Sequence, residues 1–254
     1  MWTGSRDSGV KEPASSPLRL FSLNALDASN ASLYLGVIPM KRPSFFDAVS
    51  HLALPQHGLV TIAQAERVGR SAEEVLDLVA KGAVVEIADG VVRVPSDSPP
   101  IPLIELWAAW LQLSPAQTAS ERVSGGGQPD AVVSHVSAAA VYNLGVLDAD
   151  IHRFTVSREM YTGRDDVQFY PAPLSRRQWS LVDGLPVLKP IHMIVQLHES
   201  RIDSTYVGDM IREGLYFRMF QRPELVRLLG AIDERFSGEH VVQELLDVSA
   251  GGFR

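Results

Sequence analysis

The chain has 254 residues, of which 46% are hydrophobic and 21% charged, enough apolar content for one large folded domain or two small ones. Its formal net charge of −7 argues against a protein that binds nucleic acid through general positive charge. The absence of cysteine excludes disulfides and thiolate chemistry, and without an apolar run of about 20 residues no membrane span is expected.

Residues 1–42 show no sustained hydrophobic period and are rich in Ser, Asn, Pro and Gly, so they are predicted to form a disordered extension. Regular patterns begin just after Met40, and a second interpretation is therefore that Met40 is the true initiator and the preceding residues are not translated. The N-terminus has no apolar stretch followed by a small-residue cleavage site, which predicts a cytoplasmic location.

Two helices are predicted between residues 44 and 69. Ser44 is expected to cap a helix that runs to about Leu54, because its apolar positions fall on one face. Thr61 is the expected cap of a short second helix over 62–68.

A third helix is predicted from the cap residue Ser71 to Lys81, where Gly82 stops it. Glu74, three residues after Ser71, is expected to complete a capping box. The apolar side chains expected to face the core are Ala72, Val75, Leu76 and Val79.

The β-branched runs "AVVEI" and "VVRV" follow this helix and are joined by Ala88-Asp89-Gly90, a strong signal for a β-hairpin. Three short helices followed by a hairpin predict a winged helix-turn-helix domain over residues 44–95.

A second domain is predicted over residues 101–250, after a linker at 95–102. Its elements are a mixture of helices and strands, so the fold class is α+β, with an N-terminal winged helix-turn-helix followed by a mixed α/β C-terminal domain. The expected helices are "LIELWAAWLQL", 134–145, 190–199, 206–220 and segments of 223–249, and the expected strands are "HRFTVS", "DVQFYPAP" and "GLPVLKP".

The candidate DNA contacts of the first domain are basic side chains that could reach phosphates and polar ones that could reach phosphates or base edges. They are Thr61, Gln64, Arg67, Arg70, Ser71, Lys81 and Arg93. The third helix also carries Glu73, Glu74 and Asp77, which phosphate would repel. Tight binding would therefore need a dimer on a repeated site, and the alternative that this surface serves only for protein contacts stays open.

No set of residues with the spacing of a catalytic or metal site is found. Ser134 precedes His135 and a run of small residues, which favours a helix cap over a nucleophile. His192 and His198 are six positions apart and so lie on different faces of a helix, which argues against a metal site. We expect no enzymatic activity, no cofactor and no metal.

Two groups of side chains in the second domain allow alternative interpretations. The apolar residues near 210–220 have helical spacing and are expected in the core, although a hydrophobic patch for a protein partner could use the same set: Met210, Tyr216, Phe217, Met219 and Phe220. The five arginines 153, 158, 164, 176 and 177 are read either as part of a balanced surface or as contacts to an acidic partner or phosphate.

The order of three segments resembles the AbiEi family of antitoxins from bacterial type IV toxin–antitoxin (abortive-infection) pairs, and the actinobacterial type in particular. These segments are "HGLVTIAQAERVGRS", "VVSHVSAAAVYNLGVLDADIHRFTVS" and "DGLPVLKPIHMIVQL", and the resemblance covers roughly residues 44–220. This sequence differs from the family pattern in two places. The third helix of the family usually carries several arginines, whereas this one has only Lys81. The segment after Gly-Leu-Pro reads "VLKPIHMIVQL" where the family usually has a Thr-Pro-Glu-Arg run.

The resemblance implies a winged helix that binds inverted repeats in its own promoter, and a C-terminal domain that neutralises a nucleotidyltransferase-type toxin without catalysis or a cofactor. The leading hypothesis is therefore a non-catalytic antitoxin and autorepressor, a monomer or a dimer on DNA. The alternative is a winged-helix regulator that senses a small ligand, which a deep polar pocket in the second domain would favour.

Overall fold

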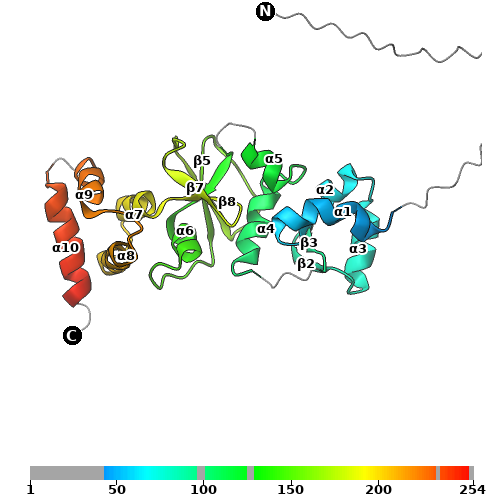
Figure 1. The fold of residues 1–254 in the computed structure, drawn as a ribbon, viewed down its shortest axis with the longest axis horizontal. Helices are drawn as coiled ribbons and strands as arrows, with labels where there is room; N and C mark the ends of the chain where they lie inside the picture. Colours follow the sequence, from blue (N-terminus) through cyan, green and yellow to red (C-terminus); the bar gives the residue numbers. More distant parts are fainter. Residues whose placement is uncertain (1–42, 96–100, 125–128, 233–234, 252–254) are drawn as a thin grey trace, which may run out of the picture. The chain divides into compact units, whose positions relative to one another are not determined.

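A computed structural model describes residues 43–95, 101–124, 129–232 and 235–251 (Figure 1). Within it, Pro43–Arg254 form one compact unit of mixed α+β structure with two sheets. The disorder predicted for residues 1–42, and most of the loop and linker predicted at 124–130 and 95–102, lie outside the described residues. No helix in the described part of the chain is long and apolar enough to cross a membrane.

The first helices begin at the predicted caps. Helix α1 (Phe45–Ala53) starts after Ser44, whose hydroxyl accepts the amide hydrogen of Asp47, and the short 3-10 helix η2 (Leu54–Gln56) continues it. Helix α2 (Ile62–Arg67) starts after Thr61, whose hydroxyl accepts from the amide of Gln64 at 3.0 Å. The N-termini of α1 and α2 each form a reciprocal capping box, which explains why these short helices start where they do.

Helix α3 (Ala72–Ala80) begins at the predicted cap Ser71, but two details of the prediction are wrong. The Glu74 carboxylate does not complete a capping box, because it pairs with Arg70 at 3.2 Å instead. Leu76 is 51% exposed, whereas its neighbour Val75 is fully buried. Adjacent residues on a helix point about 100° apart, so an inward stripe centred on Val75 leaves Leu76 at the surface.

A three-stranded antiparallel sheet follows the order β1-β3-β2. The predicted hairpin is confirmed: β2 (Val85–Ala88) and β3 (Val91–Arg93) are joined across Asp89 and Gly90, and Gly90 has a φ of 69°. Strand β1 (Leu59–Thr61), which pairs with β3, was not predicted. Its three residues are too few to show an alternating pattern.

Helix α4 (Ile104–Gln112) links the two sheets. Its residues from Leu106 to Leu111 are all buried, and they belong to one apolar cluster with Leu59 and Val91 of the first sheet. A smaller separate cluster lies among α1, α3 and the first sheet, around Val49, Val75 and Val92. The short helix α5 (Ala119–Ser124), which was not predicted, follows α4.

The second sheet has five strands in the order β6-β5-β4-β8-β7. Strands β4 and β8 are parallel, as are β5 and β6, while β4 with β5 and β7 with β8 are antiparallel. The predicted extended segments at β5, β6 and β8 are confirmed, and β4 and β7 were missed. The five are β4 (Ala131–Val133), β5 (His152–Val156), β6 (Val167–Pro171), β7 (Trp179–Val182) and β8 (Leu185–Leu188).

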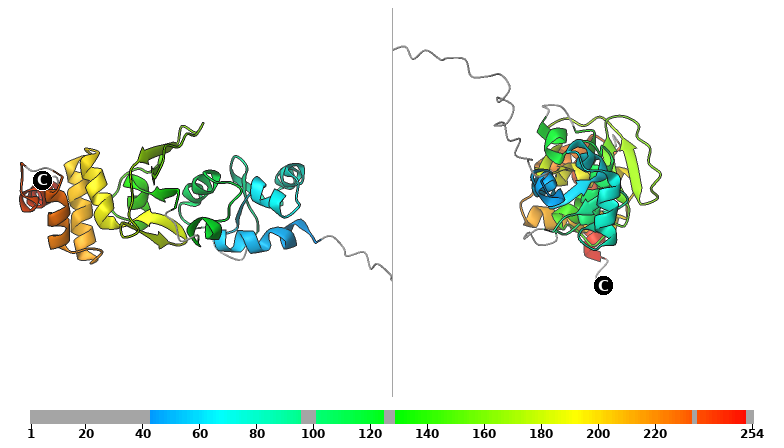
Figure 2. Two further views of the ribbon diagram at one scale, coloured as in Figure 1. Left: turned by 90° about the horizontal axis from the view of Figure 1, so that it is seen from above. Right: turned by 90° about the vertical axis from the view of Figure 1, so that its right-hand side faces the viewer.

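Helices α6 (His135–Tyr142) and α7 (Pro190–Glu199) follow the parallel strands β4 and β8 and pack against each other. The last three helices form a group in which α10 contacts both α8 and α9 (Figures 1 and 2). They are α8 (Ser204–Tyr216), α9 (Arg222–Gly230) and α10 (Gly238–Gly251). Helices were predicted in these places, but the helix predicted over 206–220 ends at Tyr216.

Candidate functional site

Two of the predicted DNA contacts, Thr61 and Gln64, are buried between α2 and the segment after α4. The Thr61 hydroxyl donates to the carbonyl of Pro115, and the Gln64 amide donates to the carbonyl of Gln117 at 2.7 Å. Gln64 also bonds to the amide of Gln56 at 2.9 Å. Both side chains are therefore used within the protein, where they fix α2 against residues 115–117.

Arg67, at the end of α2, makes a bidentate ion pair with Glu121 of α5, with both nitrogen–oxygen distances at 2.7 Å. Its guanidinium also donates to the carbonyl of Ala116 at 2.5 Å. The hydrogen bonds from Arg67 and the Thr118 amide lower the pKa of Glu121 to about 2. Arg67 is 47% exposed, so it reaches solvent while it is held by this carboxylate.

Arg70 lies in the turn between α2 and α3, and its side chain is only 5% exposed. It donates to the carbonyls of Pro43 and Ser44, the latter at 3.0 Å, and pairs with Glu74. These bonds tie the start of α1 to the start of α3. The Arg70 side chain therefore stabilises the fold through bonds within the protein.

The other three predicted DNA contacts lie nearer the surface. Ser71 is exposed and accepts the amide hydrogen of Glu74 at 3.2 Å. Lys81, after the end of α3, pairs with Asp77 at 2.5 Å. Arg93 is half-buried on β3, opposite Leu59 and Val85 in the sheet register.

The outward face of α3 is acidic and apolar. Glu73 and Asp77 are exposed there together with Leu76, and only Lys81 adds a positive charge at the end of the helix. A helix that reads DNA bases usually presents arginine or polar amides to the groove. This face therefore offers little for base recognition, and phosphate contacts would have to come from the ends of the helix and from the hairpin.

The chain matches no protein-family model, and no curated protein is significantly similar to it in sequence.

Ser134 occupies the predicted cap position of α6, but its side chain makes no capping hydrogen bond. Its hydroxyl is instead 2.9 Å from Nδ1 of His135, and both residues are buried. The His135 ring stacks on Tyr170 with the ring centroids 3.8 Å apart. Burial and the nearby Arg153 charge lower the pKa of His135 to about 4, so the imidazole is neutral at pH 7.

This pair differs from a catalytic dyad in its access and its partners. Ser134 is fully buried and His135 is only 5% exposed, and among the described residues no hydrogen bond from a carboxylate orients the ring. His135 adopts a φ of 51°, and its stacked ring and the Ser134 contact hold it there. In the described ranges, no group of three or more His, Asp or Glu side chains is placed to hold a metal ion.

An exposed apolar patch, formed by Tyr216, Phe217 and Met219, lies at the end of α8. Tyr216 is 80% exposed and Phe217 is 59% exposed, and their rings meet edge to face with centroids 5.1 Å apart. Met210 and Phe220 are buried, so the prediction that the whole set lies in the core is wrong for the other three. Met210 is buried within α8, whereas Tyr216 is the last residue of α8 and Phe217 and Met219 follow its end.

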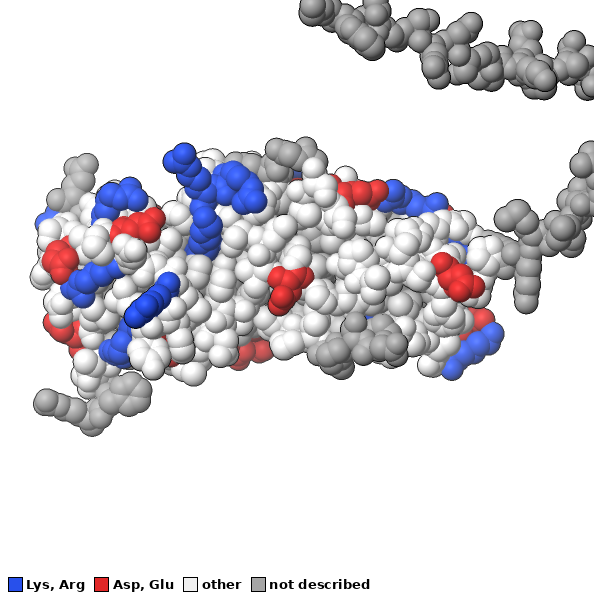
Figure 3. All heavy atoms as spheres, in the orientation of Figure 1, with Lys and Arg blue, Asp and Glu red and all other residues white. Residues whose placement is uncertain are grey.

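The arginines near the second sheet have different environments. Arg164 pairs with Asp166, and the Arg176 guanidinium lies 4.0 Å from the ring centroid of Trp179. Arg153 donates to Gln168 at 3.3 Å. On the face shown in Figure 3, Lys and Arg are more numerous over the second sheet and the C-terminal helices than over the end that holds α1–α3. On this face, the Lys and Arg side chains are thus more numerous away from α1–α3.

Proposed function

We propose that the chain is a non-catalytic antitoxin of the cytoplasm that binds a nucleotidyltransferase-type toxin through its C-terminal helices and represses its own operon. The patch at Tyr216, Phe217 and Met219 carries the proposal. Two adjacent aromatic rings that stand in solvent cost free energy unless a partner covers them, and such residues are enriched at protein interfaces.

The surroundings of the patch suit a protein partner. A depression of about 390 Å³ beside the two rings is lined by Asn143, Arg212 and Glu213. The Glu213 carboxylate accepts the amide hydrogen of Gly145 at 2.7 Å, which fixes the depression against the loop after α6. An apolar centre with a polar, charged rim is the usual arrangement of a protein–protein interface.

The DNA-binding half of the proposal is supported by the order of elements in residues 44–95. Three helices precede a hairpin, and α3 follows α2 after a turn of four residues, as in a winged helix-turn-helix. We assign the DNA contacts to Arg67, Ser71, Lys81 and Arg93. The buried residues Thr61, Gln64 and Arg70 act on this surface by holding α2 and α3 in place.

Co-expression with the neighbouring toxin gene tests the antitoxin half. The intact chain is expected to restore growth and to co-purify with the toxin, whereas the double variant Tyr216→Ser/Phe217→Ser is expected to fold but lose both properties. Tyr161→Ser is the matched control, because Tyr161 is 87% exposed and lies outside the patch. Rescue and co-purification by the double variant at the level of the intact chain would reject the patch as the toxin site.

The DNA half is tested separately on the chain's own promoter. Glu121→Gln removes the competitor for Arg67, so it is expected to raise promoter affinity and to increase the slope of log K against log salt by about 1. The same substitution in an Arg67→Ala background is expected to have no such effect. An equal gain in both backgrounds, or no promoter binding at low salt, contradicts the assignment.

A further inference from the structure

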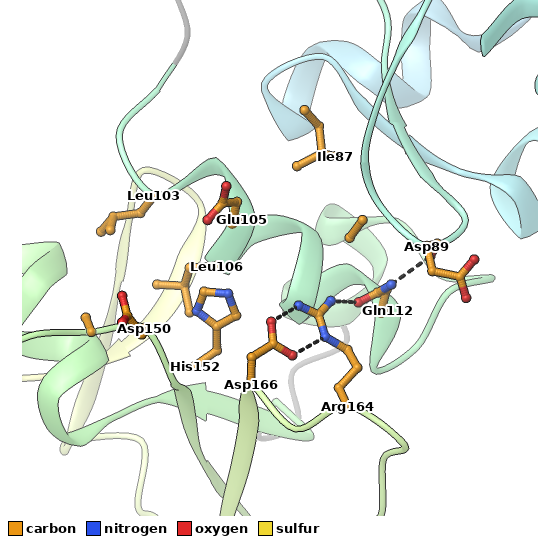
Figure 4. A pocket seen from close by; sticks show the side chains of 12 residues that line it. Ile87, Asp89, Leu103, Glu105, Leu106, Gln112, Asp150, His152, Arg164 and Asp166 are labelled. Atoms are coloured by element: carbon orange, nitrogen blue, oxygen red, sulfur yellow. Dashed lines mark hydrogen bonds and ion pairs between the residues drawn. The ribbon is translucent and has the colours of Figure 1, made fainter. Parts of the chain in front are cut away.

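A pocket of about 620 Å³ lies between the β2–β3 hairpin, α4 and the β5–β6 edge of the second sheet (Figure 4). Leu103 and Leu106 provide apolar wall, and Glu105 contributes a carboxylate from the first turn of α4. His152, at the start of β5, and Asp166, just before β6, lie across from them. Three segments that are distant in sequence therefore meet around one hollow.

His152 is the unusual group in this pocket. The residue is only 9% exposed, and its backbone amide donates to the carbonyl of Asp166 at 2.7 Å. Neither ring nitrogen has a hydrogen-bond partner among the residues that the structure describes, and the ring is directed into the hollow (Figure 4). Because the His152 ring lines the pocket, a bound donor or acceptor can reach its nitrogens.

Burial is the main influence on the charge of this ring. It lowers the pKa of His152, and the Arg164 charge lowers it further, while Asp166 and Glu105 oppose them. At neutral pH the ring is thus uncharged, with one nitrogen that donates and one that accepts. The accepting nitrogen can therefore take a hydrogen bond from a donor group of a ligand.

The remaining charges around the hollow are mostly negative. Arg164 is already occupied, since it pairs with both oxygens of Asp166 and donates to Gln112. Glu105 has no ion pair or hydrogen bond with any residue in the described ranges. A hydrogen bond with Asp148 raises the pKa of Asp150, a sign of carboxylates placed close together. Negative charge therefore exceeds positive charge, which disfavours an anionic ligand.

We propose that this pocket binds a small organic cation, with an ammonium group that donates to His152 and pairs with Glu105 while its apolar body packs on Leu103 and Leu106. A metal ion is a poor fit, because no three His, Asp or Glu side chains of the described chain converge on one point. An ammonium group has three donors and needs acceptors at different angles, which an imidazole nitrogen and a carboxylate provide. None of its residues is among the proposed toxin or DNA contacts. The pocket matches the ligand-sensing alternative only in part, because the β2–β3 hairpin forms one of its walls, whereas that alternative places a deep polar pocket within the second domain.

Calorimetric titration of the full chain with 2-phenylethylamine tests the proposal, with the neutral analogue 2-phenylethanol and the anion 3-phenylpropionate as comparison ligands. The amine is expected to bind at least about fivefold more tightly than the alcohol, the value of one screened ion pair. The anion is expected not to bind. Equal affinity for amine and alcohol, or no heat with the amine in the millimolar range, overturns the proposal.

Two variants locate the bound amine. Glu105→Gln is expected to weaken amine binding about fivefold without changing the affinity for the alcohol, since it removes only the ion pair. Glu199→Gln is the matched control, because Glu199 is exposed at the end of α7 and lies outside the pocket. The imidazole NMR signals of His152, assigned with His152→Gln, are expected to shift as the amine is added. Unchanged His152 signals, or equal effects of the two glutamine variants, also overturn the proposal.

Discussion

The guanidinium of Arg122 lies over the indole ring of Trp110, 3.6 Å from the ring centroid. The same guanidinium pairs with Asp130 at 2.6 Å and donates to the carbonyl of Trp110. Its side chain is only 1% exposed, so α4, α5 and the start of β4 are joined by one buried charge. Removing either the arginine or the carboxylate would leave the other charge buried without its partner, which destabilises the fold. The aromatic face adds a cation–π contact to the same arginine.

Arg122→Ala is expected to lower the free energy of unfolding by about 3–5 kcal/mol, because it leaves Asp130 without its partner and removes the ring contact. Urea denaturation followed by tryptophan fluorescence measures this loss. Lys81→Ala is the control, since the exposed Lys81–Asp77 pair contributes less than about 1 kcal/mol. Equal losses for the two variants would show that the buried pair has no special role.

The buried His135 predicts a loss of stability in mild acid. Its pKa is about 4 in the folded protein, against about 6.5 in the unfolded chain, so between these values the unfolded state binds more protons. Stability from this residue is complete above about pH 6.5 and declines as the pH falls towards 4. His135→Asn keeps a residue that tolerates the φ of 51° and removes the titration.

The free energy of unfolding at pH 7 and pH 5 measures this effect in both proteins. The wild type is expected to lose about 2 kcal/mol more than His135→Asn between these pH values. The comparison cancels the contributions of His152 and His192, whose pKa values are also lowered by burial. Parallel pH profiles would contradict the prediction.

Gly208 allows α8 to approach α10. A Cβ atom at this position would lie 2.1 Å from the carbonyl oxygen of Leu245 and 2.6 Å from the Cβ of Ser249. Gly208→Ala is therefore expected to destabilise the protein by about 1–3 kcal/mol, despite the better helix propensity of alanine. Gly163→Ala serves as control, since a Cβ there meets nothing within 4 Å. Thermal unfolding of both variants distinguishes close packing from a general effect of replacing glycine.

Arg70→Ala is expected to reduce stability even when no DNA is present. It removes charge-assisted bonds to two backbone carbonyls, each contributing about 1.5–3 kcal/mol when buried. Circular dichroism melting of the free protein measures the change. An unchanged melting temperature combined with a loss of promoter binding would instead place Arg70 at the DNA.

The local parts of the fold could be predicted from the sequence. The caps Ser44, Thr61 and Ser71 and the Asp89-Gly90 turn depend on neighbouring residues, and all lie where they were expected. Short strands such as β4 show no period, because three residues are not enough to display one. They form because long-range pairing supplies hydrogen bonds that no local pattern records.

The candidate site was less predictable, because its side chains are paired across long sequence distances. Thr61 bonds to Pro115 and Arg67 to Glu121, and neither partner could be identified from spacing along the chain. The exposure of Tyr216 and Phe217 was likewise hidden, because helical spacing alone does not show where a helix ends. The only signal for the pocket was the presence of His152 at the start of a predicted strand, which by itself is common.

The position of α4 has a practical consequence for dissecting the protein. One side of α4 shares its apolar cluster with Leu59 and Val91, and Trp107 meets the His57 ring edge to face with centroids 4.8 Å apart. His57 in turn bonds to the carbonyl of Asp183 at 2.9 Å. A fragment cut between the hairpin and α4 would expose an apolar surface prone to aggregation on both products, so the two proposed activities are better separated by point substitutions than by truncation.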